Sequence, residues 1–83
     1  MYNLHMKFNH AVATRIKQLL KREKITQYRL AKNTGTSLRT MSYIMNSEDK
    51  NLSTKTLLAI CKGLNISVQE FFNNPLFKNK ELE

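Results

Sequence analysis

The sequence contains few of the residues that interrupt helices or cross-link chains. Its 83 residues include one proline, two glycines and one cysteine. With so few breakers, the interior of the chain favours helix, and a single cysteine excludes an internal disulfide. A chain this short buries only about 60% of the surface of its unfolded state, so we expect one domain with a small core.

Long hydrophobic runs are absent as well. No apolar stretch approaches the roughly 20 residues that span a bilayer, and none has the pattern of a signal peptide. Disulfides are rare in reducing compartments, and this chain has one cysteine. These features predict a cytoplasmic protein with no membrane partner.

The motifs of common catalytic and metal sites are missing. There is no glycine-rich phosphate loop, no CxxC and no HExxH. The six acidic residues are scattered and suggest no pair of catalytic carboxylates. His5 and His10 have no cysteine or acid at ligand spacing, and Cys61 lies in an apolar stripe typical of a core. We therefore expect a binding module with no metal and no cofactor, not an enzyme.

Positive charge is abundant and unevenly distributed. Residues 7–39 contain nine basic residues and one acidic residue, and nine minus one equals the whole net charge of +8. Residues 40–83 contain five residues of each sign and are neutral. A solvated surface is the simpler interpretation of any one lysine, but this asymmetry indicates an anionic partner, with nucleic acid as the leading candidate.

Residues 26–46 are expected to form two short helices joined by a tight turn. Thr26 and Ser37 are suitable N-caps, because each hydroxyl can accept a hydrogen bond from a free N–H at a helix start. Gly35 lies where the chain must reverse, and glycine adopts the left-handed backbone of such a turn most easily. The small side chain of Ala31 would let the two helices cross closely.

Hydrophobic spacing and capping residues extend this pattern to five helices. Asn65 suits the left-handed end of the fourth helix, and Ser67 to Glu70 form a capping box that opens the fifth. The expected helices are residues 9–24, 27–33, 38–46, 54–64 and a short one from Ser67 that ends before Pro75.

An ordered set of short pieces covers most of the chain, roughly residues 11–73. The pieces are Thr26-Gln27, Leu30-Ala31, Gly35, Ser37, Met41, Ile44, Leu52-Ser53, Leu57-Leu58, Leu64-Asn65-Ile66-Ser67 and Glu70-Phe71. No piece is specific alone, but at these spacings the chain resembles the lambda-repressor-like, Cro/XRE-type helix-turn-helix family. The resemblance implies an all-α fold: a compact five-helix DNA-binding domain whose second and third helices form the helix-turn-helix.

The resemblance also implies a division of the chain. Residues 9–74 would be the DNA-binding domain. Residues 1–8 would be an N-terminal arm, either disordered or reaching the DNA backbone, and residues 75–83 a C-terminal tail.

The outward face of the third helix carries the candidate base-reading residues. Such a helix, polar, basic and aromatic on its outer face, fits the DNA major groove. Arg39 can bond guanine with a bidentate fork or contact a phosphate. Leu38, where the family usually has a polar reader, can press on a thymine methyl or pack on the neighbouring helix. Tyr43 can use its hydroxyl on a base or phosphate or bury its ring, and Ser42 can bond either partner.

Contacts with the DNA backbone are implied for a second set of residues. Gln27 matches a family residue that bonds a phosphate from a helix N-terminus, where free N–H groups and partial positive charge favour anions. Asn46 and Lys50 match positions that touch the sugar-phosphate backbone, and Ser37 and Thr40 are further candidates.

One position pair departs from the family. Members often carry arginine at the position of Leu20 and glutamate at that of Met45, and the two form an ion pair. Helix spacing alone would leave Met45 exposed. The resemblance instead implies that it faces Leu20 within about 4.5 Å, because a packed apolar pair can replace a buried ion pair with little loss of stability.

These observations predict a sequence-specific, double-stranded-DNA-binding transcriptional regulator, most simply a repressor. We expect a homodimer on a palindromic or pseudopalindromic operator, paired through exposed apolar residues of the neutral half. The candidates for that surface are Phe71, Phe72, Leu76 and Phe77. One alternative is an antitoxin of the same fold that binds a toxin and its own promoter, and another is an RNA-binding or nonspecific polyanion-binding protein.

Overall fold

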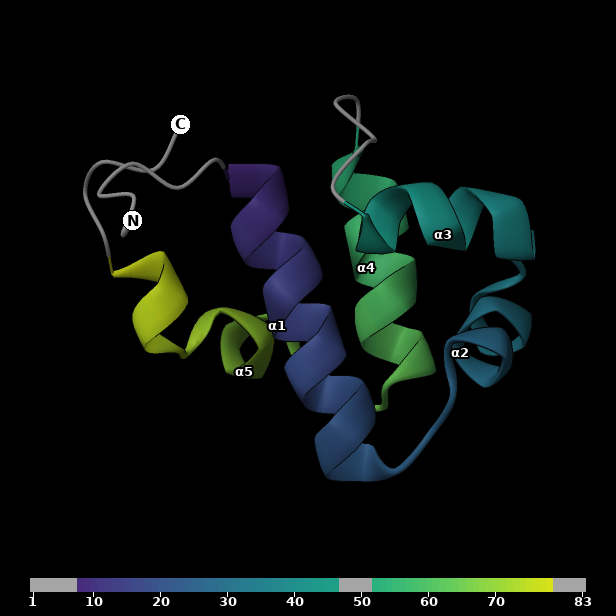
Figure 1. The fold of residues 1–83 in the computed structure, drawn as a ribbon. Coiled ribbons are helices and arrows are strands. Elements are labelled where there is room, and N and C mark those ends of the chain that lie inside the picture. The colour runs from purple at the N-terminus through teal and green to yellow at the C-terminus, as the bar shows by residue number, and fades with distance from the viewer. Residues whose placement is uncertain (1–7, 47–51, 79–83) are drawn as a thin grey trace.

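Helices account for most of the described backbone. The computed structural model describes residues 8–46 and 52–78 (Figure 1), and within them there is no strand, which confirms the all-α prediction. The predicted helix bounds agree with the structure to within about one residue. The elements are α1 (Phe8–Glu23), α2 (Gln27–Thr34), α3 (Leu38–Met45), α4 (Thr54–Gly63), α5 (Val68–Phe72) and a 3-10 helix, η1 (Pro75–Phe77).

Four of the five α-helices begin at a hydroxyl cap. The side chains of Thr26, Ser37, Ser53 and Ser67 each accept a hydrogen bond from the backbone N–H three residues later. Each bond satisfies a donor that the first turn of a helix leaves unpaired. Gly35 ends α2 in the left-handed region, with φ at 71°. The predicted caps and turn of residues 26–46 are therefore confirmed.

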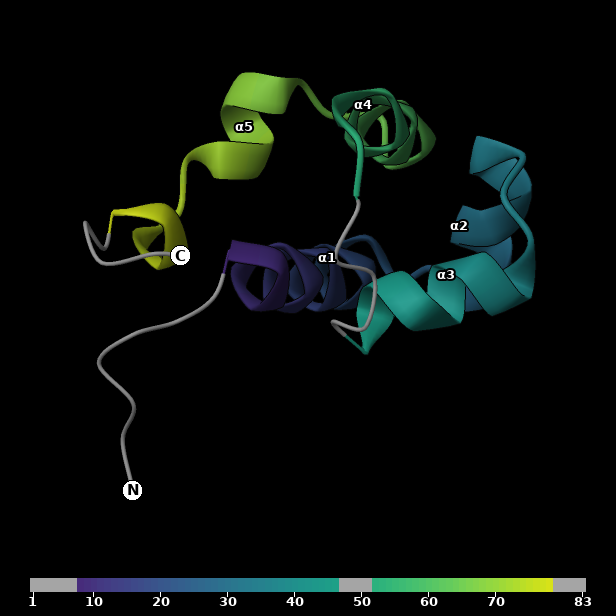
Figure 2. The same cartoon turned by 90° about the horizontal axis from the view of Figure 1, so that it is seen from above.

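The helices lie in three groups across the molecule. Figures 1 and 2 show α2 and α3 at one side, α5 and η1 at the other, and α1 and α4 between them. α3 packs against α1 and α2, and α4 packs against α2 and α5. α3 therefore has one face toward the middle of the molecule and one toward solvent.

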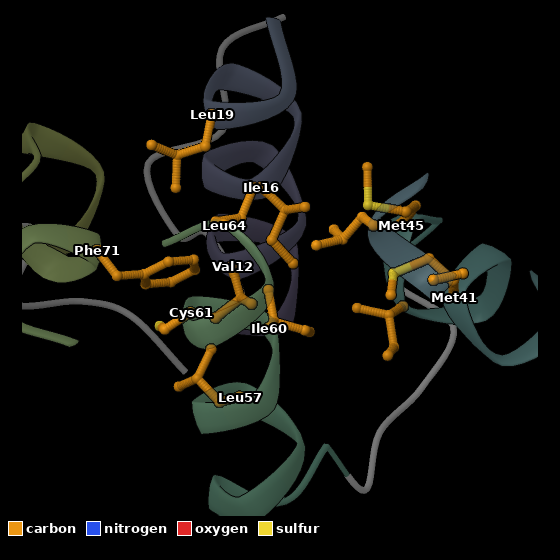
Figure 3. Packing of buried hydrophobic residues seen from close by; sticks show 13 residues of the cluster. Val12, Ile16, Leu19, Met41, Met45, Leu57, Ile60, Cys61, Leu64 and Phe71 are labelled. Atoms are coloured by element: carbon orange, nitrogen blue, oxygen red, sulfur yellow. The ribbon is translucent and has the colours of Figure 1, made fainter. Parts of the chain in front are cut away.

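A single cluster of buried side chains joins the helices. Figure 3 shows Met41 and Met45 on the α3 side of the cluster and Phe71 on the opposite side, with residues of α1 and α4 between them. Cys61 is 1% exposed, and burial raises the pKa of its thiol. Its predicted role as a core residue is confirmed.

Met45 is buried. This agrees with the family resemblance and differs from helix spacing alone, which would leave Met45 exposed. It is 4% exposed and belongs to the core cluster, because α3 packs against α1. Leu20 of α1 is half-buried against the same cluster. Direct contact between these two side chains stays a prediction.

The aromatic residues near the two ends of the described chain pack on one another. The ring centroids of Phe72 and Phe77 are 4.8 Å apart, those of Phe71 and Phe72 are 5.1 Å apart, and Phe8 lies 6.2 Å from both Phe72 and Phe77. Phe71 is fully buried and Phe72 and Phe77 are half-buried, as is Leu76. Of the four residues predicted to form an exposed apolar surface, Phe71 is buried and takes no part in one. Phe72, Leu76 and Phe77 keep part of their surface exposed, and a role for them in pairing two protomers stays a prediction.

The described helices extend one residue before and three residues beyond the predicted domain of residues 9–74. Phe8 opens α1 instead of belonging to an arm, and Pro75–Phe77 forms η1, which packs against α1. Burial of the Phe77 ring is the physical reason that the domain continues past Pro75. Residues 1–7 of the predicted arm and 79–83 of the predicted tail lie outside the described residues.

Candidate nucleic-acid interface

α3 has a buried face and an open face. Met41, Ile44 and Met45 are at most 4% exposed, whereas Leu38 is 48% and Tyr43 is 43% exposed. The buried residues anchor the helix to the core, and the cap at Ser37 fixes where it starts. The open face is thus presented to solvent on a firmly held backbone.

Side chains on the open face associate in pairs one helical turn apart. The guanidinium carbon of Arg39 lies 5.9 Å from the centroid of the Tyr43 ring. Asn46 Nδ2 donates a hydrogen bond to Ser42 Oγ at 3.4 Å. Both pairs have the i, i+4 spacing that brings side chains together on a helix surface. Four of the predicted contact residues therefore lie on one surface, together with Leu38, which is 48% exposed.

Gln27, Ser37 and Thr40 are the other predicted backbone contacts that the structure describes. Gln27 is the half-buried first residue of α2, directly after the cap at Thr26. The hydroxyl of Ser37 is used locally, since it accepts from the Thr40 N–H and donates to Thr40 Oγ1 at 2.9 Å. That bond leaves the proton of the Thr40 hydroxyl available to an external acceptor. Lys50 lies outside the described residues.

Arg15 binds backbone groups of the protein itself, a role that its spacing in the sequence did not reveal. It is only 7% exposed, and its Nε and Nη2 donate to the carbonyl oxygens of Phe71 at 2.8 Å and Glu70 at 2.9 Å. Burial lowers the pKa of its guanidinium, and the nearby charge of Arg22 lowers it further. The guanidinium satisfies carbonyls at the end of α5, where a cation also favours the helix dipole. Nothing near Arg15 in sequence signals these partners, which lie 55 and 56 residues away.

Arg22 is also directed to α5. Its Nη2 lies 2.8 Å from Glu70 Oε2 and its Nε lies 2.9 Å from Glu23 Oε2. Hydrogen bonds to Glu23 and then to Glu70 raise the pKa of Arg22. Since α5 and α3 lie on different sides of α1 (Figure 1), neither Arg15 nor Arg22 adds charge to the open face of α3.

The basic residues available to an anion are therefore a subset of the predicted ones. At 100° per residue, Lys17 and Lys21 lie about 200° and 240° around α1 from Arg15, on its far side. Both are exposed, as are Lys24 and Arg29, and within the described part of the chain these four side chains form no ion pair.

A capped α2, a left-handed glycine turn and a second helix with one open face together define a helix-turn-helix protein. Comparison with protein-family models matches residues 15–74 to the Cro/C1-type helix-turn-helix DNA-binding domain. The chain belongs to this family, which confirms the resemblance seen in the sequence, and its partner class is double-stranded DNA. Neither curated proteins nor solved structures give a match. No helix in residues 8–46 or 52–78 has the length and apolarity to cross a membrane.

Proposed function

We propose that the protein is a transcriptional repressor that inserts α3 into the major groove of a specific DNA sequence. The observation that carries this proposal is the open face of α3, where an arginine, a leucine, a serine and a tyrosine project from a helix anchored by three buried residues. The major groove admits an α-helix and shows a different pattern of donors, acceptors and methyl groups for each base pair. A rigid helix with varied side chains suits that surface.

The contacts divide into base-reading and backbone-binding ones. Arg39 bonds guanine O6 and N7, and Leu38 contacts a thymine methyl, with Ser42 and Tyr43 beside them on the open face. Backbone contacts position the helix and do not themselves read sequence. We assign these to Gln27, Thr40, Asn46 and Lys50, with Ser37 acting chiefly as the cap that presents α3.

Two protomers are proposed to bind one operator. One recognition helix reads too few base pairs to select a site in a genome, and two-fold pairing would place two such helices about 34 Å apart on one face of the duplex. The mass of the complex at saturation tests this, with two protomers per operator expected. One protomer per operator would contradict it.

The toxin-binding alternative is less well supported than DNA binding. It depended on Leu76, Phe77 and the adjacent phenylalanines as a surface for another protein, and the rings of Phe71, Phe72 and Phe77 pack on one another within the domain. This packing within the domain already uses part of their apolar surface, so we do not propose a toxin partner.

Selection from a pool of random DNA duplexes tests the proposed function. We expect the protein to enrich a defined sequence and to bind it more tightly than a scrambled duplex or single-stranded RNA. Arg39→Ala should cost about 1–3 kcal/mol and relax preference at one base pair, since a bidentate base contact is lost. Lys21→Ala should weaken all duplexes alike if it contacts phosphate. Equal affinity for the selected, scrambled and RNA ligands would refute sequence-specific binding.

A further inference from the structure

Arg39 and Tyr43 form a cation–π pair on the open face of α3. The distance of 5.9 Å from the guanidinium carbon to the ring centroid lies within the range of cation–π attraction. Both side chains are exposed. Within the described residues, Arg39 has no hydrogen bond or ion pair from its side chain, and the Tyr43 hydroxyl has no hydrogen-bond partner. Among the described residues, the aromatic ring is therefore the one group in attractive contact with the Arg39 guanidinium.

The pairing matters because of the geometry that guanine requires. A bidentate contact needs two N–H groups of the planar guanidinium aligned with O6 and N7. An arginine side chain has much rotamer freedom to lose when it is fixed in that orientation. A guanidinium already held over a ring has lost part of that freedom before binding, while its N–H groups remain free to donate.

Taking the proposed function as its basis, we propose that Tyr43 is a positioning residue whose ring orients Arg39 for a guanine contact. The ring face is the active part of the side chain, and the hydroxyl is dispensable. Ser42 and Asn46 form a separate pair on the same helix, joined by a 3.4 Å hydrogen bond, and do not hold Arg39. The assignment replaces a direct contact of the Tyr43 hydroxyl with DNA.

Two substitutions separate the ring from the hydroxyl. The probe is the duplex that the wild-type protein selects from the random pool, and the guanine is the base pair at which Arg39→Ala relaxes preference. Tyr43→Phe keeps the ring, and we expect its affinity to stay within about 2-fold of wild type. Tyr43→Leu removes the ring, and we expect a loss of about 2- to 30-fold, the range of a cation–π contact. The same loss should appear in discrimination of guanine from 7-deazaguanine at that position.

The Arg39→Ala background shows whether Tyr43 acts through Arg39. There, Tyr43→Leu should cause no further loss, because the group that the ring positions is absent. Tyr28→Leu is the matched control, since Tyr28 is also exposed and lies 5.7 Å from the Lys32 ammonium, but on α2. It should leave discrimination at the guanine unchanged. Thermal unfolding of each variant confirms that the domain is folded.

Several outcomes would overturn the inference while sequence-specific binding stands. These are a Tyr43→Phe loss as large as that of Tyr43→Leu, which indicates a hydroxyl contact, or additive losses in the double variant. A third is an Arg39→Ala variant that weakens every duplex equally, which makes Arg39 a phosphate contact. Failure to select any sequence would overturn the proposed function itself, and this inference with it.

Discussion

At the scale of single residues, Lys24 has an unusual backbone. It follows α1 with φ at 58°, a left-handed conformation that L-amino acids with a side chain adopt at a cost. Glycine adopts this conformation without that cost and is the usual residue after a helix end. Lys24→Gly should therefore raise the free energy of unfolding by up to about 1 kcal/mol in urea titrations, although glycine makes the unfolded chain more flexible.

Lys21→Gly is the matched control for this substitution. Lys21 lies inside the last turns of α1, where glycine costs about 1 kcal/mol relative to a good helix former. The two substitutions should therefore change stability in opposite directions. A loss of stability in both would show that the left-handed backbone of Lys24 is not strained.

Leu38 is the apolar residue of the open face. Its proposed contact with a thymine methyl can be tested by changing the operator. If it contacts a thymine methyl, deoxyuridine at that position should weaken binding about 4-fold, from the roughly 0.8 kcal/mol of one buried methyl group. Deoxyuridine keeps the hydrogen-bonding edge of thymine and removes only the methyl. The effect should disappear in Leu38→Ser. Wild-type binding that tolerates deoxyuridine at every thymine of the operator would exclude this role.

At the scale of helices, Gly63 sets how closely α4 approaches α2. A Cβ at this position would lie 2.8 Å from Thr34 Cγ2 and 3.2 Å from Leu30 Cδ1. Gly63→Ala gains up to about 1 kcal/mol of helix propensity but crowds this contact, so we expect a net loss of about 1 kcal/mol in chemical unfolding. Thr34→Ser removes the crowding methyl and retains the hydroxyl that donates to the Ala31 carbonyl at 3.0 Å. The double variant should recover most of the loss. A neutral Gly63→Ala would show that the interface gives way easily.

The contact between α1 and α3 makes a second prediction at this scale. Met45→Glu would place a carboxylate at a site that is 4% exposed, and the unfolding free energy should fall by about 3–5 kcal/mol. Adding Leu20→Arg should recover much of that loss if the two side chains face each other across the helices. Unfolding of both single variants and the double variant measures their coupling. Independent, additive losses would mean that residues 20 and 45 do not meet.

At the scale of the whole molecule, the placement of charge predicts the response to salt. A dimer that neutralises about 6–10 phosphates should lose roughly 10³–10⁵ in affinity between about 50 and 200 mM salt. Arg22 is paired with Glu23 and Glu70 beside α5, so Arg22→Gln should leave the salt slope unchanged. A slope that is flat for the wild-type protein, or that falls with Arg22→Gln, would contradict the proposed orientation on DNA.

Features that depend on neighbours within one helical turn follow from the sequence alone. The caps at Thr26 and Ser37 join a side chain to a backbone group three residues away. The left-handed backbone at Gly35 and Asn65 depends on the type of residue at each of those positions. The helices and the helix-turn-helix were therefore predictable. The pair of Arg39 and Tyr43 has equally local spacing, and the sequence contained the signal for it.

Tertiary structure alone decided features that depend on distant partners. Arg15 resembles any other basic residue of α1 until its guanidinium meets carbonyls 55 and 56 residues away. Phe72 and Phe77 look fully exposed until Phe8, far away in sequence, packs beside them and leaves them half-buried. Whether a side chain is buried depends on which helix packs over it, and the spacing of residues along one helix contains no information about that neighbour.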